Sequence, residues 1–594
     1  MKTYTGAQLL RILLERQGIH TIAGIPGGAI LPFYDALHGG GIRHILARHE
    51  QGAGFIAQGM ARATGRAAVC VATSGPGATN LLTAIADARL DSVPLVAITG
   101  QVPQPLIGTD AFQEVDTYGL TLPITKHNFL VRSAAELLEV VPLAFQIAES
   151  GRPGPVAIDV PKDVLNATLA VEALPPPGRP ASMPRCPDTA IEELAAQLTN
   201  AQRPVLYLGG GVIGAGAAEL ARTLARRLNA PVVSTLMALG AMDADDPLHM
   251  GMLGMHGGKG TNLLLHEADF LLAIGARFDD RATGKAAEFC PHASIAHIDI
   301  DRAEIGKIKR ATLGLTGDAA DILRRLLAQL PDSPQRPHWR RRAAELREEH
   351  PLHCPPRAED PLHPVNLIRF IGEQLPSDAI ITTDVGQHQM WVAQAYPFRQ
   401  PRTLLTSGGL GTMGFGLPAA IGAALALDES EGGASPAHAA RAEPDRLAAP
   451  ELSRTADAGR SRRVVCISGD GSILMNIQEL ATLAELALPV AIIVLNNANL
   501  GLVRQQQELF YGQRYAASRL EHAPDFAALA RSFGLRGVRL DPRADPLAQL
   551  AEALNAPGPC LIDVPIEDAA NVYPMVPPGA ANHETIIAPE LALT

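Results

Sequence analysis

The sequence reads Val464-Val465-Cys466-Ile467-Ser468-Gly469-Asp470-Gly471-Ser472 where an apolar strand pattern runs into a glycine-rich loop. A helical pattern is predicted over 473–486, and a second apolar run, 490–495, ends in Asn496-Asn497. Strand, loop, helix and strand form the repeating unit of a parallel α/β sheet. Both loops would then leave the carboxyl ends of neighbouring strands, which is where open α/β sheets bind ligands.

These two loops carry the residue types of a magnesium and diphosphate site. Asp470 offers a carboxylate and Asn497 a neutral carbonyl oxygen, and Mg²⁺ takes a few such hard ligands together with phosphate oxygens. Gly469 and Gly471 let the backbone approach a diphosphate closely. The pattern is not a P-loop, because no Gly-Lys-Ser/Thr follows, and not a dinucleotide fingerprint, because a ribose-binding acid is missing. A plain turn is the alternative for a lone Gly-Asp-Gly.

The arrangement resembles the thiamine diphosphate signature, in which Gly-Asp-Gly precedes Asn-Asn by one strand-and-helix unit. Enzymes with this signature need a glutamate from another domain, and Glu50 in Arg48-His49-Glu50-Gln51-Gly52 is the candidate. The resemblance implies that Glu50 hydrogen-bonds the aminopyrimidine ring of the cofactor and promotes its imino tautomer. Taken alone, Glu50 is also explained as a helix N-terminal acid that the helix dipole stabilises.

Longer motifs extend the resemblance over nearly the whole chain, to the large subunits of acetohydroxyacid synthase (acetolactate synthase). Two of them are Thr73-Ser74-Gly75-Pro76-Gly77-Ala78-Thr79-Asn80 and Thr406-Ser407-Gly408-Gly409-Leu410-Gly411-Thr412-Met413-Gly414. The others cover 24–29, 100–103, 107–114, 125–128, 151–155, 160–163, 253–257, 275–281, 297–301 and 385–391. Many long motifs in the right order are more specific than any one of them.

The resemblance implies three cofactors, namely thiamine diphosphate, Mg²⁺ and FAD, and it implies their contacts. Mg²⁺ would be held by Asp470, Asn497 and the backbone of Asn499. Contacts to thiamine diphosphate and its loops would fall on Glu50, Gln113, Gln387, His388, Gly408, Gly409, Gly411, Met413, Gly469, Gly471, Ser472, Asn497 and Gly501. FAD contacts would fall on Arg152, Gly210, Thr235, Leu236, Leu253, Met255, His256, Gly275, Arg277, Asp279, Asp299, Ile300 and Asp318.

The resemblance also implies the reaction. Pyruvate would lose CO₂ on thiamine diphosphate, and the hydroxyethyl carbanion would condense with a second 2-ketoacid, pyruvate or 2-ketobutyrate. This is the first common step of valine, leucine and isoleucine biosynthesis. Arg281 would bind the carboxylate of the acceptor, because an arginine fork fits a carboxylate. Lys162 and Phe112 would line the same entrance, and Met413 would support the bent cofactor, although ordinary core packing explains a methionine equally well.

One position departs from the family pattern. Gln506 stands where most members carry a tryptophan that is associated with preference for 2-ketobutyrate as acceptor. Glutamine lacks the flat apolar surface that would pack the extra methyl group, which is worth about 1–3 kcal/mol in an apolar pocket. We therefore expect the acceptor preference to differ from that of the family even where the reaction does not.

Composition limits the class of protein. The 594 residues suffice for about three domains, and 47% of them are hydrophobic. A net charge of −11 argues against a nucleic-acid binder, which would show a basic face. The six cysteines have no metal-type spacing, and those in strand patterns (Cys70, Cys466) are expected to be buried free thiols. Because no targeting or spanning segment is visible, a cytoplasmic enzyme is expected.

The expected fold class is α/β, with three consecutive parallel-sheet domains. A pyrimidine-binding domain is expected over 1–180, a central FAD-binding-like domain over 187–335, and a diphosphate-binding domain over 362–570. Residues 571–594 would form a C-terminal tail. Residues 428–461 are rich in Ala, Glu, Pro and Ser and contain no aromatic side chain, so we expect a disordered insertion there.

Several alternatives remain at this stage. Another thiamine diphosphate enzyme, such as glyoxylate carboligase, pyruvate oxidase or a 2-ketoacid decarboxylase, would share much of the pattern. Glyoxylate carboligase lacks the activating glutamate, and Glu50 argues against it. A catalytically silent binding subunit would not need Glu50, Asp470 and Asn497 together. The resemblance further implies a homodimer or higher oligomer with active sites at the interface, and a possible small regulatory subunit.

Overall fold

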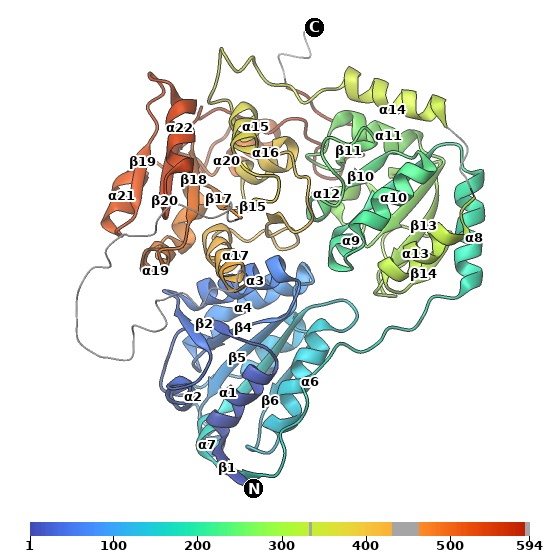
Figure 1. Ribbon diagram of the computed structural model, residues 1–594. Coiled ribbons are helices and arrows are strands. Elements are labelled where there is room, and N and C mark those ends of the chain that lie inside the picture. The colour runs from blue at the N-terminus through green and yellow to red at the C-terminus, as the bar shows by residue number, and fades with distance from the viewer. Residues whose placement is uncertain (332–335, 431–461, 589–594) are drawn as a thin grey trace.

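The computed structural model describes residues 1–331, 336–430 and 462–588. Figure 1 shows three α/β bodies: the first in blue, the second in green, and the third in yellow to red. Each body contains one six-stranded sheet whose pairings are all parallel. The expected insertion over 428–461 lies outside the described residues, except that 428–430 end a helix.

The first body spans residues 2–171. Its sheet contains β2 (Thr21–Gly24), β3 (Arg43–Leu46), β4 (Ala68–Ala72), β5 (Leu95–Gln101), β6 (His127–Leu130) and β7 (Pro155–Pro161). A separate antiparallel pair joins β1 (Lys2–Thr5) to β8 (Thr168–Val171). The helices are α1 (Gly6–Arg16), α2 (Leu31–Leu37), α3 (Glu50–Thr64), α4 (Pro76–Leu90), α5 (Thr117–Thr121), α6 (Leu137–Glu149) and α7 (Lys162–Asn166).

The second body follows a proline-rich connection. Its strands are β9 (Pro204–Leu208), β10 (Val232–Ser234), β11 (His249–Met252), β12 (Phe270–Ile274), β13 (Ser294–Asp299) and β14 (Leu313–Thr316). Its helices are α8 (Asp188–Asn200), α9 (Gly210–Gly214), α10 (Ala218–Leu228), α11 (Lys259–Glu267), α12 (Asp280–Thr283) and α13 (Ala319–Gln329). Helix α14 (Pro337–Glu349) follows and packs against this body through the buried Trp339, whose Nε1 donates to Pro204 O at 2.9 Å.

The third body contains the quoted stretch. Its strands are β15 (Ile380–Thr383), β16 (Leu404–Leu405), β17 (Val464–Gly469), β18 (Val490–Asn496), β19 (Arg536–Arg539) and β20 (Cys560–Pro565). Its helices are α15 (Pro364–Gln374), α16 (Gln387–Ala395), α17 (Gly416–Ser430), α18 (Asp470–Ile473), α19 (Glu479–Leu486), α20 (Gly501–Phe510), α21 (Phe526–Ser532) and α22 (Pro546–Asn555). Strands β17 and β18 are parallel neighbours, as predicted.

Strand order relates the first and third bodies. When strands are numbered within each body, the first sheet (β3-β2-β4-β5-β7-β6) has the order 2-1-3-4-6-5. The third sheet (β16-β15-β17-β18-β20-β19) has the same order, 2-1-3-4-6-5. The second sheet (β11-β10-β9-β12-β13-β14) has the order 3-2-1-4-5-6, which is that of dinucleotide-binding sheets. Each order reverses beside the first strand of the sheet, and the loops at that point are the expected ligand sites.

The first and third bodies pack through α3 and α17, which lie side by side at the centre of Figure 1. The two backbones touch at small residues, because a Cβ on Gly59 would overlap Ala419 O and a Cβ on Gly422 would overlap Ile56 O. Phe55 and Phe415 meet edge to face beside them, with ring centroids 5.3 Å apart. A single hydrophobic cluster therefore runs from the first sheet through both helices into the third.

Strand β1 precedes the first helix, and Thr5 caps that helix in a capping box with Gln8. Local structure departs from the sequence expectation in the third body. The single helix expected over 473–486 is divided into α18, a 3₁₀ turn at Leu474–Asn476, and α19. Asn476 explains the break, since its Nδ2 donates to Gly414 O at 2.8 Å and to Gln51 Oε1 at 3.1 Å.

Two further expectations can be compared with the structure. The six cysteines are unpaired, and Cys70 and Cys466 are fully buried, as predicted. Across the described ranges 1–331, 336–430 and 462–588, no helix has the length and apolar character needed to cross a membrane.

Candidate functional site

The order of the third sheet reverses between β15 and β17, and both following loops carry predicted site residues. Gln387 and His388 begin α16 after β15, and Asp470 begins α18 directly after β17. The two loops are in close contact, because a Cβ on Gly469 would lie 2.8 Å from His388 Nδ1. The structure thus brings the Gly-Asp-Gly loop and the Gln387-His388 pair to one switch point of the sheet.

Asp470 is a buried carboxylate that lacks a full set of partners. Asp470 is only 2% exposed, and its Oδ1 accepts a hydrogen bond from Gly471 N at 2.9 Å. Within the described residues, Oδ2 has no hydrogen-bond partner. Burial raises the pKa of Asp470 to about 6, although backbone N–H groups of Gly471 and of residues 497–499 oppose the rise. A buried carboxylate oxygen that has no hydrogen-bond partner is stabilised by a cation, and Mg²⁺ fits this donor set.

The loop after β18 completes the donor set. Asn497 Nδ2 donates to Gln387 Oε1 at 3.1 Å, which fixes the orientation of the amide. The oxygen end of that amide is the kind of ligand that a hard cation takes. Asn499 Nδ2 donates to Asn497 O at 2.6 Å and holds the loop in shape. Asp470 and Asn497 therefore lie on adjacent strand ends, and both are nearly buried.

Close packing explains two of the predicted glycines. A Cβ on Gly501 would overlap Gln387 Oε1, and a Cβ on Gly471 would overlap Leu500 Cδ2.

His388 is 4% exposed, and desolvation by burial lowers its pKa to about 3, so its imidazole is neutral. Its Nε2 is buried with no partner in the part of the chain that the structure describes. A polar ligand at this corner would satisfy that nitrogen.

Glu50 is the first residue of α3, at the carboxyl edge of the first sheet. His49 caps the helix through a bond from Gln51 N, and Asn80 Nδ2 donates to Glu50 Oε2 at 2.9 Å. Gln113 stands in the left-handed region with φ 59°, and its backbone packs against Gly75. The start of α3 also contacts the segment that follows Asp470, because Arg48 N and His49 N donate to Glu479 Oε1 at 2.9 and 3.1 Å. Glu50 itself bonds to Asn80 of the first body, and Asp470 bonds to Gly471 of the third.

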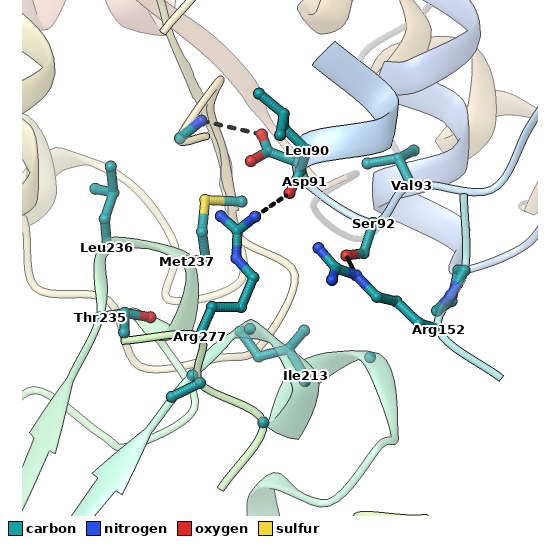
Figure 2. Close-up of a pocket in the computed structure, with 18 of the residues that line it drawn as sticks. Leu90, Asp91, Ser92, Val93, Arg152, Ile213, Thr235, Leu236, Met237 and Arg277 are labelled. Atoms are coloured by element: carbon teal, nitrogen blue, oxygen red, sulfur yellow. Dashed lines mark hydrogen bonds between the residues drawn. The ribbon is translucent and has the colours of Figure 1, made fainter. Parts of the chain in front are cut away.

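A cavity of about 960 Å³ opens where the three bodies meet, and Figure 2 shows part of its wall. Many predicted cofactor contacts line it, namely Arg152, Gly210, Thr235, Leu236, Leu253, Met255, His256, Gly275, Arg277, Asp279, Asp299, Ile300, Asp318, Gly408 and Gly411. The predicted thiamine and metal residues Glu50, Gln113, Gln387, His388, Met413, Gly469, Asp470, Gly471, Ser472, Asn497, Asn499 and Gly501 are not among its lining residues, and neither is Gly409.

The cavity fits a dinucleotide. It lies over the point where the second sheet reverses, between β9 and β12. Thr235 Oγ1 and His256 Nδ1 are buried in its wall without a hydrogen-bond partner among the described residues, as expected where a polar ligand supplies the partner. A volume near the upper end of the range for cofactor sites suits a molecule of the size of FAD.

The triple glycine after β9, Gly209 to Gly211, contains the predicted FAD contact Gly210. Gly209 N donates to Ile274 O at 2.9 Å and Gly211 N donates to Gly275 O at 3.1 Å, so protein acceptors use both amides. A Cβ on Gly209 would overlap Gly275 O. The glycines therefore let the loops after β9 and β12 touch, and all three line the cavity.

Charged residues around the cavity are tied to one another. Arg152 Nη1 contacts Glu304 Oε1 at 2.6 Å, and its Nε donates to Ser92 Oγ at 2.8 Å. Asp318 caps α13 through Asp321 N at 2.9 Å. The Arg152–Glu304 bond joins the first and second bodies along the wall, while the other two bonds lie within one body each. The predicted FAD contacts Arg152 and Asp318 therefore also stabilise the protein itself.

The residues predicted for the acceptor do not meet in one chain. Arg281 lines the cavity with a side chain 66% exposed, and its Nη1 lies 3.6 Å from Met255 Sδ. Gln506 lines the same cavity from α20. Phe112 is 87% exposed on the first body, and Lys162 begins α7 there. Neither belongs to the cavity wall as described.

Sequence reasoning missed several residues at this site. Asp91, Met237 and Glu304 line the cavity without belonging to any motif quoted above, and Gln389 lines it from the 385–391 motif without a role assigned to it. Asp91 resembles an ordinary acid at a helix end, and Met237 an ordinary core residue. A signal existed only for Asp91, because acids are disfavoured at helix C-termini, where the dipole repels them.

Comparisons with known proteins agree with this geometry. Three protein-family models match: "Thiamine pyrophosphate enzyme, N-terminal TPP binding domain" over 4–120, the "central domain" over 191–326, and the "C-terminal TPP binding domain" over 384–564. The chain is 54% identical to acetolactate synthase isozyme 1 large subunit of Escherichia coli, covering 98% of each chain. It is 46% identical to isozyme 2 large subunit of the same organism, covering 98% of this chain and 99% of the relative.

A relative from a second organism gives the same result. The acetolactate synthase large subunit of Parasynechococcus marenigrum is 48% identical, covering all of this chain and 93% of the relative. With identity of this level over the full length, the chain belongs to the thiamine pyrophosphate enzyme family, among the acetolactate synthase large subunits.

Proposed function

We propose that the chain is the catalytic large subunit of an acetolactate synthase, which joins pyruvate to a second 2-ketoacid with loss of CO₂. Pyruvate as acceptor gives 2-acetolactate, and 2-ketobutyrate gives 2-aceto-2-hydroxybutyrate, the first common step toward valine, leucine and isoleucine. The observation that carries the proposal is the corner of Asp470, Asn497 and Gln387 at the switch point of the third sheet, in a chain with full-length relatives of this name.

Thiamine diphosphate would supply the nucleophilic carbon and the electron sink for decarboxylation. The chain's own residues hold and orient it. Asp470, Asn497 and the backbone of Asn499 would bind Mg²⁺, and the loop glycines Gly469 and Gly471 would admit the diphosphate. Glu50 would hold a proton at the aminopyrimidine ring, with its own carboxylate oriented by Asn80.

The resemblance implies an active site shared between two chains, in which the Glu50 of one chain and the Asp470 of the other would serve the same cofactor. We therefore propose a homodimer, with Lys162 and Phe112 of one chain facing Arg281 of the other. C₂ symmetry is the commonest arrangement of such pairs. The exposure of Phe112, an apolar side chain at 87%, agrees with a partner covering it.

Arg281 and FAD complete the proposal. The exposed guanidinium of Arg281 would bind the acceptor carboxylate at the cavity mouth. FAD would occupy the cavity of about 960 Å³. Since the proposed reaction neither oxidises nor reduces its substrates overall, FAD would be structural.

Three finer statements rest on the resemblance and the relatives' names. A small regulatory subunit is proposed because the relatives are named large subunits. A cytoplasmic location remains a prediction. So do the domain boundaries 1–180, 187–335 and 362–570 with the tail 571–594.

Product identification tests the function. The purified chain, with thiamine diphosphate and Mg²⁺, is given pyruvate alone, then pyruvate with 2-ketobutyrate, each with and without FAD. Acetolactate and CO₂ without uptake of oxygen are expected. Oxygen uptake with peroxide would favour a pyruvate oxidase, and tartronate semialdehyde from glyoxylate, in place of acetolactate from pyruvate, would favour a glyoxylate carboligase.

A further inference from the structure

The loop of residues 407–412 separates two ligand sites. Ser407, Gly408 and Gly411 line the cavity. Immediately beyond the loop, Gly414 N donates to Asp384 Oδ1 at 2.7 Å, at the carboxyl end of β15 beside the Gln387-His388 pair. The loop therefore borders the cavity on one side and leads directly to the thiamine corner on the other. Few side chains of the loop itself are large enough to fix its shape.

Asp91, at the end of α4 in the first body, holds this loop by its backbone. Asp91 Oδ1 accepts a bond from Gly409 N at 2.7 Å, and Oδ2 accepts one from Gly408 N at 3.0 Å. The Asp91 side chain is completely buried. Charge-assisted bonds of this kind are stronger than neutral ones, and one carboxylate here orients two consecutive peptide groups.

A second carboxylate one helical turn earlier holds the two ends of the loop. Asp87 Oδ1 accepts bonds from Ser407 Oγ and from Thr412 Oγ1, the latter at 3.0 Å. Arg62 Nη2 lies between the two acids, 3.1 Å from Asp87 Oδ2 and 2.9 Å from Asp91 Oδ2. Two buried carboxylates thus share one guanidinium, and burial together with the Asp91 charge raises the pKa of Asp87. The excess negative charge makes the loop's N–H and O–H donors necessary.

The second body reaches the same junction, as Figure 2 shows. Arg277 Nη1 donates to Leu90 O at 2.7 Å, at the residue before Asp91. Met237 fills the space over Gly408, where an added Cβ would overlap Met237 Sδ. Arg277 and Met237 both line the cavity. A ligand in the cavity would therefore contact Asp91 itself together with Arg277, which holds the preceding residue Leu90, and Met237, which packs over Gly408.

We propose that Asp91 is a positioning residue that transmits occupancy of the flavin cavity to the affinity for thiamine diphosphate, by holding the 407–412 loop. The inference rests on the proposed function for the identity of the two ligands. The flavin would then have a structural role in a redox-neutral enzyme. It would complete the cavity wall that holds this loop in the conformation that binds thiamine diphosphate. Because coupling is reciprocal, each ligand strengthens binding of the other by the same factor.

The test measures binding and requires no turnover, so it can fail while the proposed function stands, and the reverse. Thiamine diphosphate is titrated calorimetrically at saturating Mg²⁺ into flavin-loaded and flavin-stripped chain, with flavin content read from its absorbance. In the wild type, stripping is expected to weaken binding by about tenfold, toward the lower end of the usual range of about 5–150-fold for coupled sites. In Asp91→Asn the carboxamide offers a donor where Gly408 N, Gly409 N or Arg62 needs an acceptor. The loaded variant should therefore bind about as weakly as the stripped wild type, with a loaded-to-stripped ratio within about twofold of one.

Asp269→Asn is the matched control, because Asp269 also accepts two consecutive backbone bonds, from Gln202 N at 2.9 Å and Arg203 N at 2.8 Å, away from the loop. It should retain the wild-type ratio. If Asp91→Asn does not fold, Thr412→Val removes one hydroxyl donor from Asp87 and should lower the ratio in the same direction by a smaller amount. A wild-type ratio near one, or an Asp91→Asn ratio equal to that of the wild type, overturns the proposal. So does a control that loses its ratio to the same degree, since Asp91 would then act only through general stability.

Discussion

The first and third sheets have the same strand order, yet their loops carry different chemistry. After the third strand, the third sheet has Gly469-Asp470-Gly471, whereas the first sheet has Thr73-Ser74-Gly75. Asp470 Oδ2 is buried and has no hydrogen-bond partner among the described residues, while Thr73 Oγ1 accepts a bond from Ala29 N at 3.3 Å. One framework thus carries the proposed metal site in one sheet and an internal hydrogen bond at the same position of the other.

The loops after the second strand of each sheet differ in the opposite sense, because here the first sheet carries the proposed catalytic residue. In the first sheet, β3 leads into Glu50, while in the third sheet the short strand β16 leads into the 407–412 loop held by Asp87 and Asp91. The comparison teaches that topology fixes where ligands bind, at the carboxyl ends of the strands, while single loop residues decide what binds. The chemistry of the enzyme is divided between two sheets of one design.

The largest expected effect comes from the metal corner. Asp470→Ala removes the carboxylate proposed for Mg²⁺ and should weaken thiamine diphosphate binding by about 100-fold or more, which corresponds to about 2.7 kcal/mol. The measurement is a calorimetric titration at several Mg²⁺ concentrations. Thr73→Val, at the equivalent position of the first sheet, should leave the Mg²⁺ dependence unchanged. Equal effects of the two substitutions would contradict the assigned difference between the sheets.

Glu50 tests the complementary half. Glu50→Gln keeps an oxygen that can accept from Asn80 Nδ2, so cofactor binding should be retained. Turnover of pyruvate should fall by about 100-fold or more, the scale of a lost acid–base contribution. Gln51→Glu, at the next position in α3, is the control for an acid at the helix start and should not restore turnover to Glu50→Gln. Near wild-type turnover of Glu50→Gln with saturated cofactor would remove Glu50 from the mechanism.

A hybrid dimer tests whether the two sheets cooperate between chains. Glu50→Gln and Asp470→Ala chains, carrying different affinity tags, are co-expressed and purified through both tags. One intact and one doubly altered site per dimer should give about half of the wild-type activity, as expected for a C₂ pair with shared sites. If both halves of a site came from one chain, every site would carry one substitution, and the hybrid would be as inactive as its parents.

The smallest effect concerns acceptor choice. Gln506→Trp adds a flat apolar surface to the cavity and should raise the preference for 2-ketobutyrate over pyruvate by about tenfold, or 1–2 kcal/mol. Product ratios in direct competition give the value. Val503→Trp is the control, because Val503 is 45% exposed on the same helix and does not line the cavity as described. A strong wild-type preference that Gln506→Trp leaves unaltered would place acceptor selection at other residues.

The sequence predicted the framework well where the physics is local. The run 490–495 is apolar and rich in β-branched residues, and the structure has β18 there. Asp470 and Asn497 were expected on neighbouring strand ends, and the pairing of β17 with β18 confirms this. Both results follow from the short range of a strand–helix–strand unit.

The rest depends on contacts between distant segments. The break after α18 arises from Asn476 bonding to Gln51 and Gly414, and no local pattern announces it. The part played by Asp91 requires knowing that Gly408 and Gly409, more than 300 positions away, lie against it. Such bonds are decided by tertiary packing, which propensity and motif reasoning do not contain.

The glycine contact between α3 and α17 has a consequence for how this chain can be divided. Gly59 and Gly422 leave no gap between the two backbones, and the hydrophobic cluster is continuous across them. The first and third bodies are therefore one cooperative folding unit, although about 200 residues of a separate body are inserted between them in the chain. A fragment ending after the first body would present the buried face of α3 to water and aggregate, whereas the second body, inserted between two ends of that unit, is the natural piece to exchange.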